Sequence, residues 1–243
     1  MACLLAALLT TLAYGQAIIW ERSEPDSSNA LVARDNASNL YFATRSSFLG
    51  GSRLKVQKIL PNGALAWESI RTFTVGPSWP TDMELSLRSI AVSPNRVIVL
   101  FHARRDGGNG AFVRSFMYGF DLLTGVYSLS GADGDSEWEI LSISGNVAAR
   151  AKRVVASGDA VIDFLAADTT SFLGSVNYYQ VTSVDDLVVD SDGSAFLAAT
   201  NTNGTVKLAK CAAGGSVYLQ NINVPSYAEE TLSRVAVDAS ANR

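Results

Sequence analysis

The chain has 243 residues, of which 48% are hydrophobic and 17% are charged, and its formal net charge is −4. Such a chain is long and apolar enough to bury a sizeable core, which argues against a disordered protein. The lack of a basic block argues against a nucleic-acid surface, because phosphate binding requires clustered Lys and Arg. One histidine and two cysteines leave no basis for a zinc finger or a disulfide scaffold.

The N-terminal segment has the pattern of a secretory signal peptide. Residues 1–20 contain no charged side chain, 4–12 form an apolar run, and small residues occupy the −3 and −1 positions of a cut after Gly15. The run is too short to span a bilayer, and we predict no membrane span elsewhere in the sequence. We therefore expect a signal peptide over 1–15 and a secreted, periplasmic or cell-surface location, with a buried apolar segment as the alternative.

One pattern recurs within residues 16–243: a short β-rich run, a turn of Asp, Ser, Asn or Gly, and usually a second β-rich run. Runs of β-branched or aromatic residues separated by such turns pair as hairpins. A longer polar stretch and another alternating run follow, as at 54–59 and 64–67 in the first copy. The copies begin at the following positions: near residues 29, 88, 152, 185 and 233.

Four strands in about 40 to 60 residues, repeated along the chain, predict an all-β fold: a β-propeller of four-stranded antiparallel blades with about four to five units. A β-sandwich is the alternative, since it also uses short strands at regular spacing. The last copy stops before its second strand. We therefore favour a truncated propeller over a ring closed by pairing of the C-terminal strand with residues 17–20.

Two stretches carry a family resemblance. Residues 32–42 followed by 56–67 resemble the β-propeller repeat of bacterial secreted and surface proteins, with an asparagine-glycine turn before Leu65 and Trp67. Residues 118–127 look like the corresponding part of quinoprotein-type propeller repeats. The resemblance implies a propeller fold and no specific activity, because such repeats are scaffolds for widely different functions.

Candidate binding residues fall near a glycine-rich stretch. His102, Arg104 and Arg105 follow an apolar strand and open the segment 107–110, where a rim loop could hold an anionic ligand. A flexible hairpin loop with solubilising charge is the favoured interpretation. Trp79 lies between two prolines and is a candidate for a rim contact or for a staple that fixes a loop to the core.

Metal and catalytic signals are weak. Asp133 and Asp135 alternate with a glycine, as in a calcium loop, but the twelfth position holds a serine, so a solvated turn is the favoured interpretation. A second acidic stretch, at 185–192, is also interpreted as solvated turn residues. No Gly-x-Ser-x-Gly elbow or cysteine pair is present. We therefore predict no catalytic residue and no cofactor apart from a weak calcium candidate, and we interpret Cys211 as a packing residue.

These observations favour a secreted, non-catalytic propeller that binds a protein or carbohydrate ligand through loops at one rim. Two alternatives stay open. The first is a structural or surface repeat segment of a larger exported protein. The second is a hydrolase or lyase built on a propeller, which would need polar residues from several blades to converge on the axis.

Overall fold

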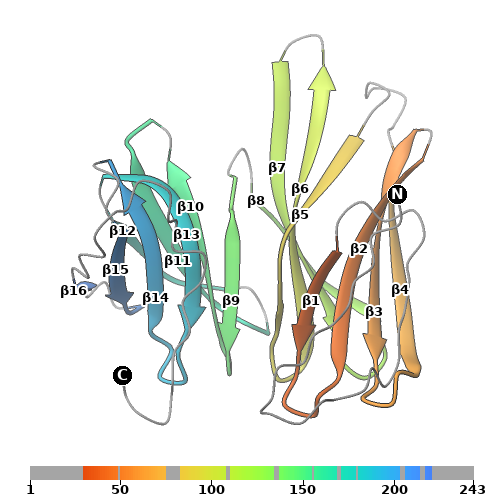
Figure 1. Cartoon of the computed structure of the whole chain (residues 1–243). Helices are drawn as coiled ribbons and strands as arrows, with labels where there is room; N and C mark the ends of the chain where they lie inside the picture. The colour runs from red at the N-terminus through yellow and green to blue at the C-terminus, as the bar shows by residue number, and fades with distance from the viewer. Residues whose placement is uncertain are drawn as a thin grey trace, which may run out of the picture.

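A computed structural model describes residues 30–48, 50–74, 83–107, 110–133, 137–154, 156–168, 171–178, 180–202, 206–213 and 217–220. The described strands form four sheets of four strands each, here named blades I to IV (Figure 1). Blade I comprises β1 (Ala30–Arg34), β2 (Leu40–Phe48), β3 (Gly51–Ile59) and β4 (Leu65–Thr74). Blade II comprises β5 (Met83–Val92), β6 (Arg96–Gly107), β7 (Gly110–Asp121) and β8 (Tyr127–Asp133). Blade III comprises β9 (Ile140–Ser144), β10 (Val147–Val154), β11 (Asp159–Ala166) and β12 (Phe172–Tyr178). Blade IV comprises β13 (Val181–Val189), β14 (Ala195–Asn201), β15 (Val206–Cys211) and β16 (Val217–Gln220).

Each blade is an antiparallel meander in which strands adjacent in sequence are adjacent in the sheet. Polar turns make this local pairing favourable. In the β1–β2 turn, Asp35 accepts hydrogen bonds from the Asn39 backbone N–H (2.9 Å) and from the Tyr41 hydroxyl (2.9 Å). The side chain thereby satisfies groups that a tight turn would otherwise leave unpaired.

The first strands of successive blades contact one another in chain order, β1 with β5, β5 with β9, and β9 with β13. Three apolar clusters fill the spaces between neighbouring blades. Because side chains alternate across a strand, one blade supplies residues to two clusters. In β6, for example, Phe101 packs toward blade I and Leu100 packs toward blade III.

The described sheets therefore confirm the prediction of an all-β fold with four-stranded antiparallel propeller blades, in the form of a partial propeller. The β-sandwich alternative is wrong, since four separate sheets stack side by side instead of two sheets facing each other. Among the described residues, no helix is long and apolar enough to cross a membrane.

The third blade begins earlier than the sequence pattern predicts. The pattern places the start of this unit near residue 152, but its first strand is β9, at Ile140–Ser144. This strand is short and contains two serines. It joins β10 through a two-residue turn at Gly145 and Asn146, so it lacks the longer polar turn that marks the other copies. The other blades begin at residues 30, 83 and 181. The predicted signal peptide (1–15) and the unit expected near 233 lie outside the described residues.

Candidate functional site

Four of the predicted site residues lie wholly or partly outside the described part of the structure. Trp79 and Asp135 lie outside the described residues. Arg105 and Asp133 lie near the ends of β6 and β8, and their side chains are also outside the description. The calcium candidate therefore stays a prediction. Within the described ranges, no group of three or more His, Cys, Asp or Glu residues is placed to hold a metal ion.

The predicted rim-loop position of His102 is wrong. β6 and β7 pair as far as Gly107 and Gly110, so His102 and Arg104 lie within a paired strand and not in the glycine-rich stretch itself. His102 lies within β6 and is only 2% exposed, whereas Arg104, two residues further along the same face, is exposed. The sequence pattern failed here because it ended the strand at the charged residues, whereas β6 continues in register with β7 up to the first glycine of the stretch.

Buried His102 is held by contacts on both sides of its ring. Its Nδ1 lies 3.1 Å from the Nε of Arg88 on β5, and its Nε2 lies 2.6 Å from the backbone oxygen of Trp138. The guanidinium N–H can only donate, so Nδ1 accepts and the proton of the neutral ring resides on Nε2. Burial lowers the pKa of His102, the bond to Trp138 raises it, and the positive charge of Arg88 lowers it further; the net shift is downward.

Trp138 lies in the segment that crosses from blade II to blade III. Its backbone N–H donates to the Oγ of Ser115 on β7 (2.9 Å), so blade II fixes this residue through both backbone groups. Its indole ring lies against blade III, with the Arg150 Cζ 4.0 Å and the Lys152 Nζ 4.5 Å from the ring centre. The ring is 3% exposed, and its Nε1 donor has no hydrogen-bond acceptor among the described residues.

The two cations beneath the ring are themselves in an apolar setting. Arg150 Nη2 pairs with Asp163 Oδ2 at 3.0 Å, and both side chains are largely buried. Burial lowers the pKa of Arg150, an effect that the Asp163 carboxylate opposes. Burial also lowers the pKa of Lys152; Asp163 raises it and the neighbouring Arg150 lowers it again.

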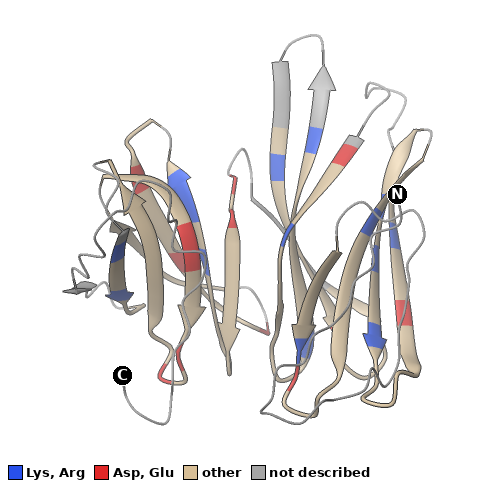
Figure 2. Ribbon diagram, viewed as in Figure 1, with Lys and Arg blue, Asp and Glu red and all other residues tan. Residues whose placement is uncertain are grey.

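We name this region the junction site. It consists of residues from both blades: Arg88, His102, Ser115, Trp138, Glu139, Arg150, Lys152 and Asp163. Figure 2 shows acidic residues in the segment that leads into β9 and basic residues on β10. The sequence pattern identified only His102, because the other members come from strands far apart in the chain. The one available signal was the alternation of Arg150 and Lys152 with alanines in the segment 147–152.

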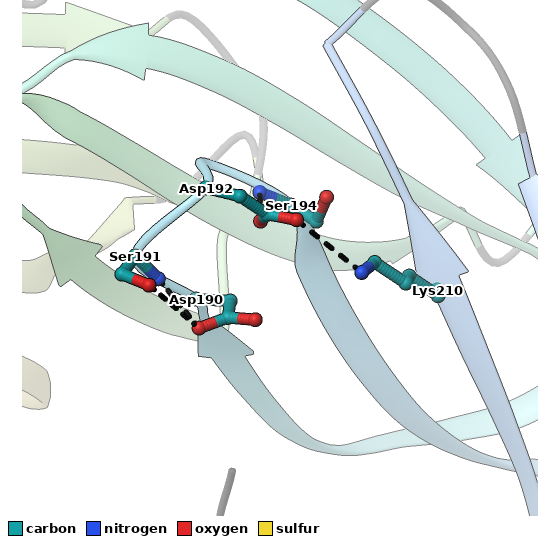
Figure 3. Close-up of polar contacts among 5 residues, drawn as sticks. All are labelled: Asp190, Ser191, Asp192, Ser194 and Lys210. Atoms are coloured by element: carbon teal, nitrogen blue, oxygen red, sulfur yellow. Dashed lines mark hydrogen bonds and ion pairs between the residues drawn. The ribbon is translucent and has the colours of Figure 1, made fainter. Parts of the chain in front are cut away.

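The acidic turn between β13 and β14 is satisfied by its own residues (Figure 3). Asp190 accepts hydrogen bonds from the N–H (2.6 Å) and hydroxyl (3.3 Å) of Ser191. Asp192 accepts from the Ser194 N–H (2.7 Å) and pairs with the Lys210 ammonium (3.3 Å). These contacts agree with the interpretation of Asp190 and Asp192 as solvated turn residues. For Asp185 and Asp186 that interpretation is wrong, because both lie half-buried within β13, where Asp185 accepts hydrogen bonds from the hydroxyls of Ser183 and Thr200.

No protein-family profile matches the chain, and no curated protein matches it. Solved structures do match. A single-site mutant of the Synechocystis apocarotenoid oxygenase is 11% identical, with a TM-score of 0.48 over 84% of this chain and 51% of that chain. The Kuenenia stuttgartiensis hydrazine synthase is 12% identical, with a TM-score of 0.43 over 86% and 70%. A chain of the mitotic checkpoint complex is 14% identical, with a TM-score of 0.46 over 83% and 56%.

This chain therefore spans about half the length of the oxygenase chains that it matches. At these identities the similarity concerns the fold, and no residue role is carried over. The expectation of a non-catalytic module is nevertheless corrected, because the matched structures include proteins named as an oxygenase and a synthase. A partial propeller of this kind gives no ground for excluding catalysis.

Proposed function

We propose that the junction site binds a small ligand that carries an oxyanion group, namely a carboxylate, sulfate or phosphate. One observation carries the proposal: the buried Nε1 donor of Trp138 has no acceptor among the described residues, and the indole ring that holds this donor contacts two cations. A buried donor without an acceptor costs about 1–3 kcal/mol. A ligand oxygen would remove that penalty.

The charge of the site supports the same ligand class. Arg150 and Lys152 lie close together in surroundings that lower the pKa of both groups, with Asp163 as their shared buried carboxylate. An anion would reduce both the desolvation cost and the mutual repulsion of the two cations. Arg88 and Arg104 add exposed positive charge on blade II, which would attract an anion to this side of the sheet.

The ligand class fits the expected carbohydrate partner if the sugar is acidic. A uronic acid or a sulfated sugar would offer the oxyanion to Trp138 and Lys152. Such a molecule could be either a bound effector or a substrate, so turnover belongs among the measurements.

Calorimetric titration with inorganic sulfate, inorganic phosphate and galacturonate at constant ionic strength tests the proposal on the full chain. We expect saturable binding of at least one of them. Trp138→Phe keeps an aromatic ring but removes the Nε1 donor, and Lys152→Gln removes one cation; each should weaken binding about tenfold, the effect of one charge-assisted hydrogen bond. Lys207→Gln, on β15 of blade IV, is the matched control and should bind as the wild type does.

Absence of binding of all three anions, or equal affinity in wild type and both variants, would contradict an oxyanion site at the junction. If galacturonate binds, incubation of the protein with galacturonate, followed by mass spectrometry, would separate a bound effector from a substrate.

We also propose that the chain is exported, on the signal-peptide pattern of residues 1–15 alone. N-terminal sequencing of the protein recovered outside the cytoplasm of an expressing cell should begin at residue 16. A mature protein that begins at Met1 would contradict export by this route.

A further inference from the structure

The two faces of blade I have different surroundings. Tyr41 and Val56 belong to the apolar cluster between blades I and II. Because side chains alternate across a strand, their neighbours in the sequence point to the opposite face, which we call the outer face of blade I. Blade I lies at one end of the row of blades (Figure 1). Its outer face includes Val32 on β1, Thr44 on β2, Gln57 and Ile59 on β3, and Ile70 on β4.

The centre of this outer face is buried. Ile59 is 0% exposed, Gln57 is 1% exposed, and Thr44 beside them is also buried. Blade IV lies at the other end of the row, and on its outer face the side chains of Phe196 and Leu208, from its two middle strands, are only half-buried. The sheet by itself therefore does not account for the burial on blade I, and additional cover lies over β2 and β3.

The cover is narrower than a blade. Neighbouring blades contact each other through their first strands, as β1 and β5 do. A further blade on the outer face would therefore bury Val32 on β1, yet Val32 is 41% exposed. Ile70 on β4 is 50% exposed. A single segment of chain over the two middle strands explains both the buried centre and the exposed edges.

The segment comes from outside the described ranges. In the described part of the chain, the strand of another blade that packs on β1, β2 and β3 is β5, which lies on the opposite face. The two long stretches outside the description are 1–29 and 221–243. The first stretch leads directly into β1 of this blade, whereas the second follows β16 of blade IV.

We propose that residues 17–20, with the sequence Ala-Ile-Ile-Trp, form a strap over the centre of the outer face of blade I. They are the apolar residues nearest to β1 on its N-terminal side, and they follow the cut expected after Gly15, so the precursor and the mature chain both keep them. Residues 21–29 link the strap to Ala30. Nine residues in extended form reach up to about 30 Å, roughly twice the width of a four-stranded sheet.

The linker complements blade I in charge. Residues 21–29 contain three acidic residues and one basic residue, whereas residues 30–74 contain six basic and two acidic residues. Opposite net charges attract the linker to this blade. The stretch 221–243 contains three acidic and two basic residues and offers little such attraction.

The strap also gives the end of the row a physical advantage. Burial of two isoleucines and a tryptophan removes apolar surface from water on both sides of the contact. An uncovered apolar sheet face at the end of a row of blades is a surface through which copies of a chain associate. The strap therefore stabilises blade I and opposes self-association at this end.

Maleimide labelling of engineered cysteines in the full chain tests the strap. Cys3→Ser removes the thiol of the N-terminal stretch, and fully buried Cys211 supplies the background rate. On this background, Thr44→Cys reports the covered centre of the outer face, and Ile70→Cys on the exposed edge of the same face is its control. We expect Thr44→Cys to react at least about tenfold more slowly than Ile70→Cys, because only opening of the strap exposes it.

Changes in the strap itself complete the test. Ile18→Asp combined with Ile19→Asp places two charges against an apolar face, so labelling of Thr44→Cys should accelerate at least about tenfold, with no change at Ile70→Cys. Trp20→Ala removes apolar contact without adding charge and should accelerate labelling by a smaller factor. Ser27→Asp combined with Ser28→Asp, in the linker, is the matched control and should leave both rates unchanged.

Two results would overturn the proposal. One is fast labelling of Thr44→Cys with the native strap, and the other is protection that survives both strap changes. In the second case, acceleration by Val235→Asp combined with Val237→Asp would assign the cover to 221–243 instead. An unchanged β-sheet circular dichroism spectrum separates release of the strap from unfolding, and if the aspartate pair unfolds the chain, the labelling rate of the Trp20→Ala variant decides.

Discussion

Two neighbouring junctions of this molecule are built around a tryptophan, and the two tryptophans differ in their hydrogen bonding. Between blades I and II, the Trp67 Nε1 donates to the Leu122 backbone oxygen at 3.0 Å. Lys58 donates to the same oxygen at 2.9 Å, and Tyr41 packs against the Trp67 ring. Between blades II and III, Trp138 is also buried, but its Nε1 has no acceptor among the described residues.

The residues that surround the two tryptophans also differ in polarity. The blade I–II junction is largely aromatic, with Phe101 packing edge-on against Tyr118 at 5.0 Å. The blade II–III junction combines a smaller aliphatic cluster with the buried ions of the junction site. An aromatic junction in which the tryptophan donor is satisfied is what stability alone favours. The unsatisfied donor and the buried charges of the other junction therefore mark it as the place to look for function.

The largest effect is expected at the blade I–II junction. Trp67→Ala removes a buried ring that contacts both blades and should lower the unfolding free energy by about 3–5 kcal/mol in urea denaturation. Ile70→Ala on the same strand is the control; its side chain is 50% exposed, so the loss should stay below about 1 kcal/mol. Equal losses for the two variants would mean that the aromatic junction does not hold the blades together.

The next effect is expected from the ion pair at the blade II–III junction. Asp163→Asn leaves Arg150 buried without its carboxylate and should cost about 3 kcal/mol by the same measurement. Asp159→Asn, on the same strand, should change stability by no more than about 0.5 kcal/mol. The double change Arg150→Met with Asp163→Leu should recover most of the loss, because it removes both buried charges. A double variant as unstable as the single one would contradict this account.

A smaller loss is expected at the contact that anchors the crossing segment. Ser115→Ala removes the acceptor of the buried Trp138 N–H and should cost about 1–2 kcal/mol. Ser128→Ala is the control, because that hydroxyl is exposed and its bond to the Gly119 oxygen is long (3.4 Å). If both serines were equally dispensable, the crossing segment would not be anchored through its backbone.

The smallest effect is expected in the acidic turn of blade IV. Lys210 and Asp192 are 36% and 54% exposed, so solvent screens their ion pair. Lys210→Ala should lower the unfolding free energy by less than about 0.5 kcal/mol, comparable to Lys207→Ala on the same strand. A loss above about 1 kcal/mol would show that this turn contributes to the fold beyond a solvated contact.

Local pattern predicted the blades because their pairing is local. Antiparallel neighbours joined by short turns are specified by alternation and turn residues alone, and β1 with β2 is an example. The same alternation placed Cys211 among the packing residues, and it is fully buried. Local pattern failed at β9, whose serines and two-residue turn carry little signal, and at His102, where the strand continues past the charged residues up to the glycine-rich stretch.

The sequence by itself determined the all-β class, the four-stranded unit and the solvated character of the acidic turn, because hairpins and turns depend on residues close together in the chain. Only the tertiary structure decided which blades meet and what lies between them. The junction site joins Arg88, Trp138 and Lys152 from three separate strands and connections. No local pattern encodes such contacts, because they arise only when completed sheets stack and bury polar groups between them.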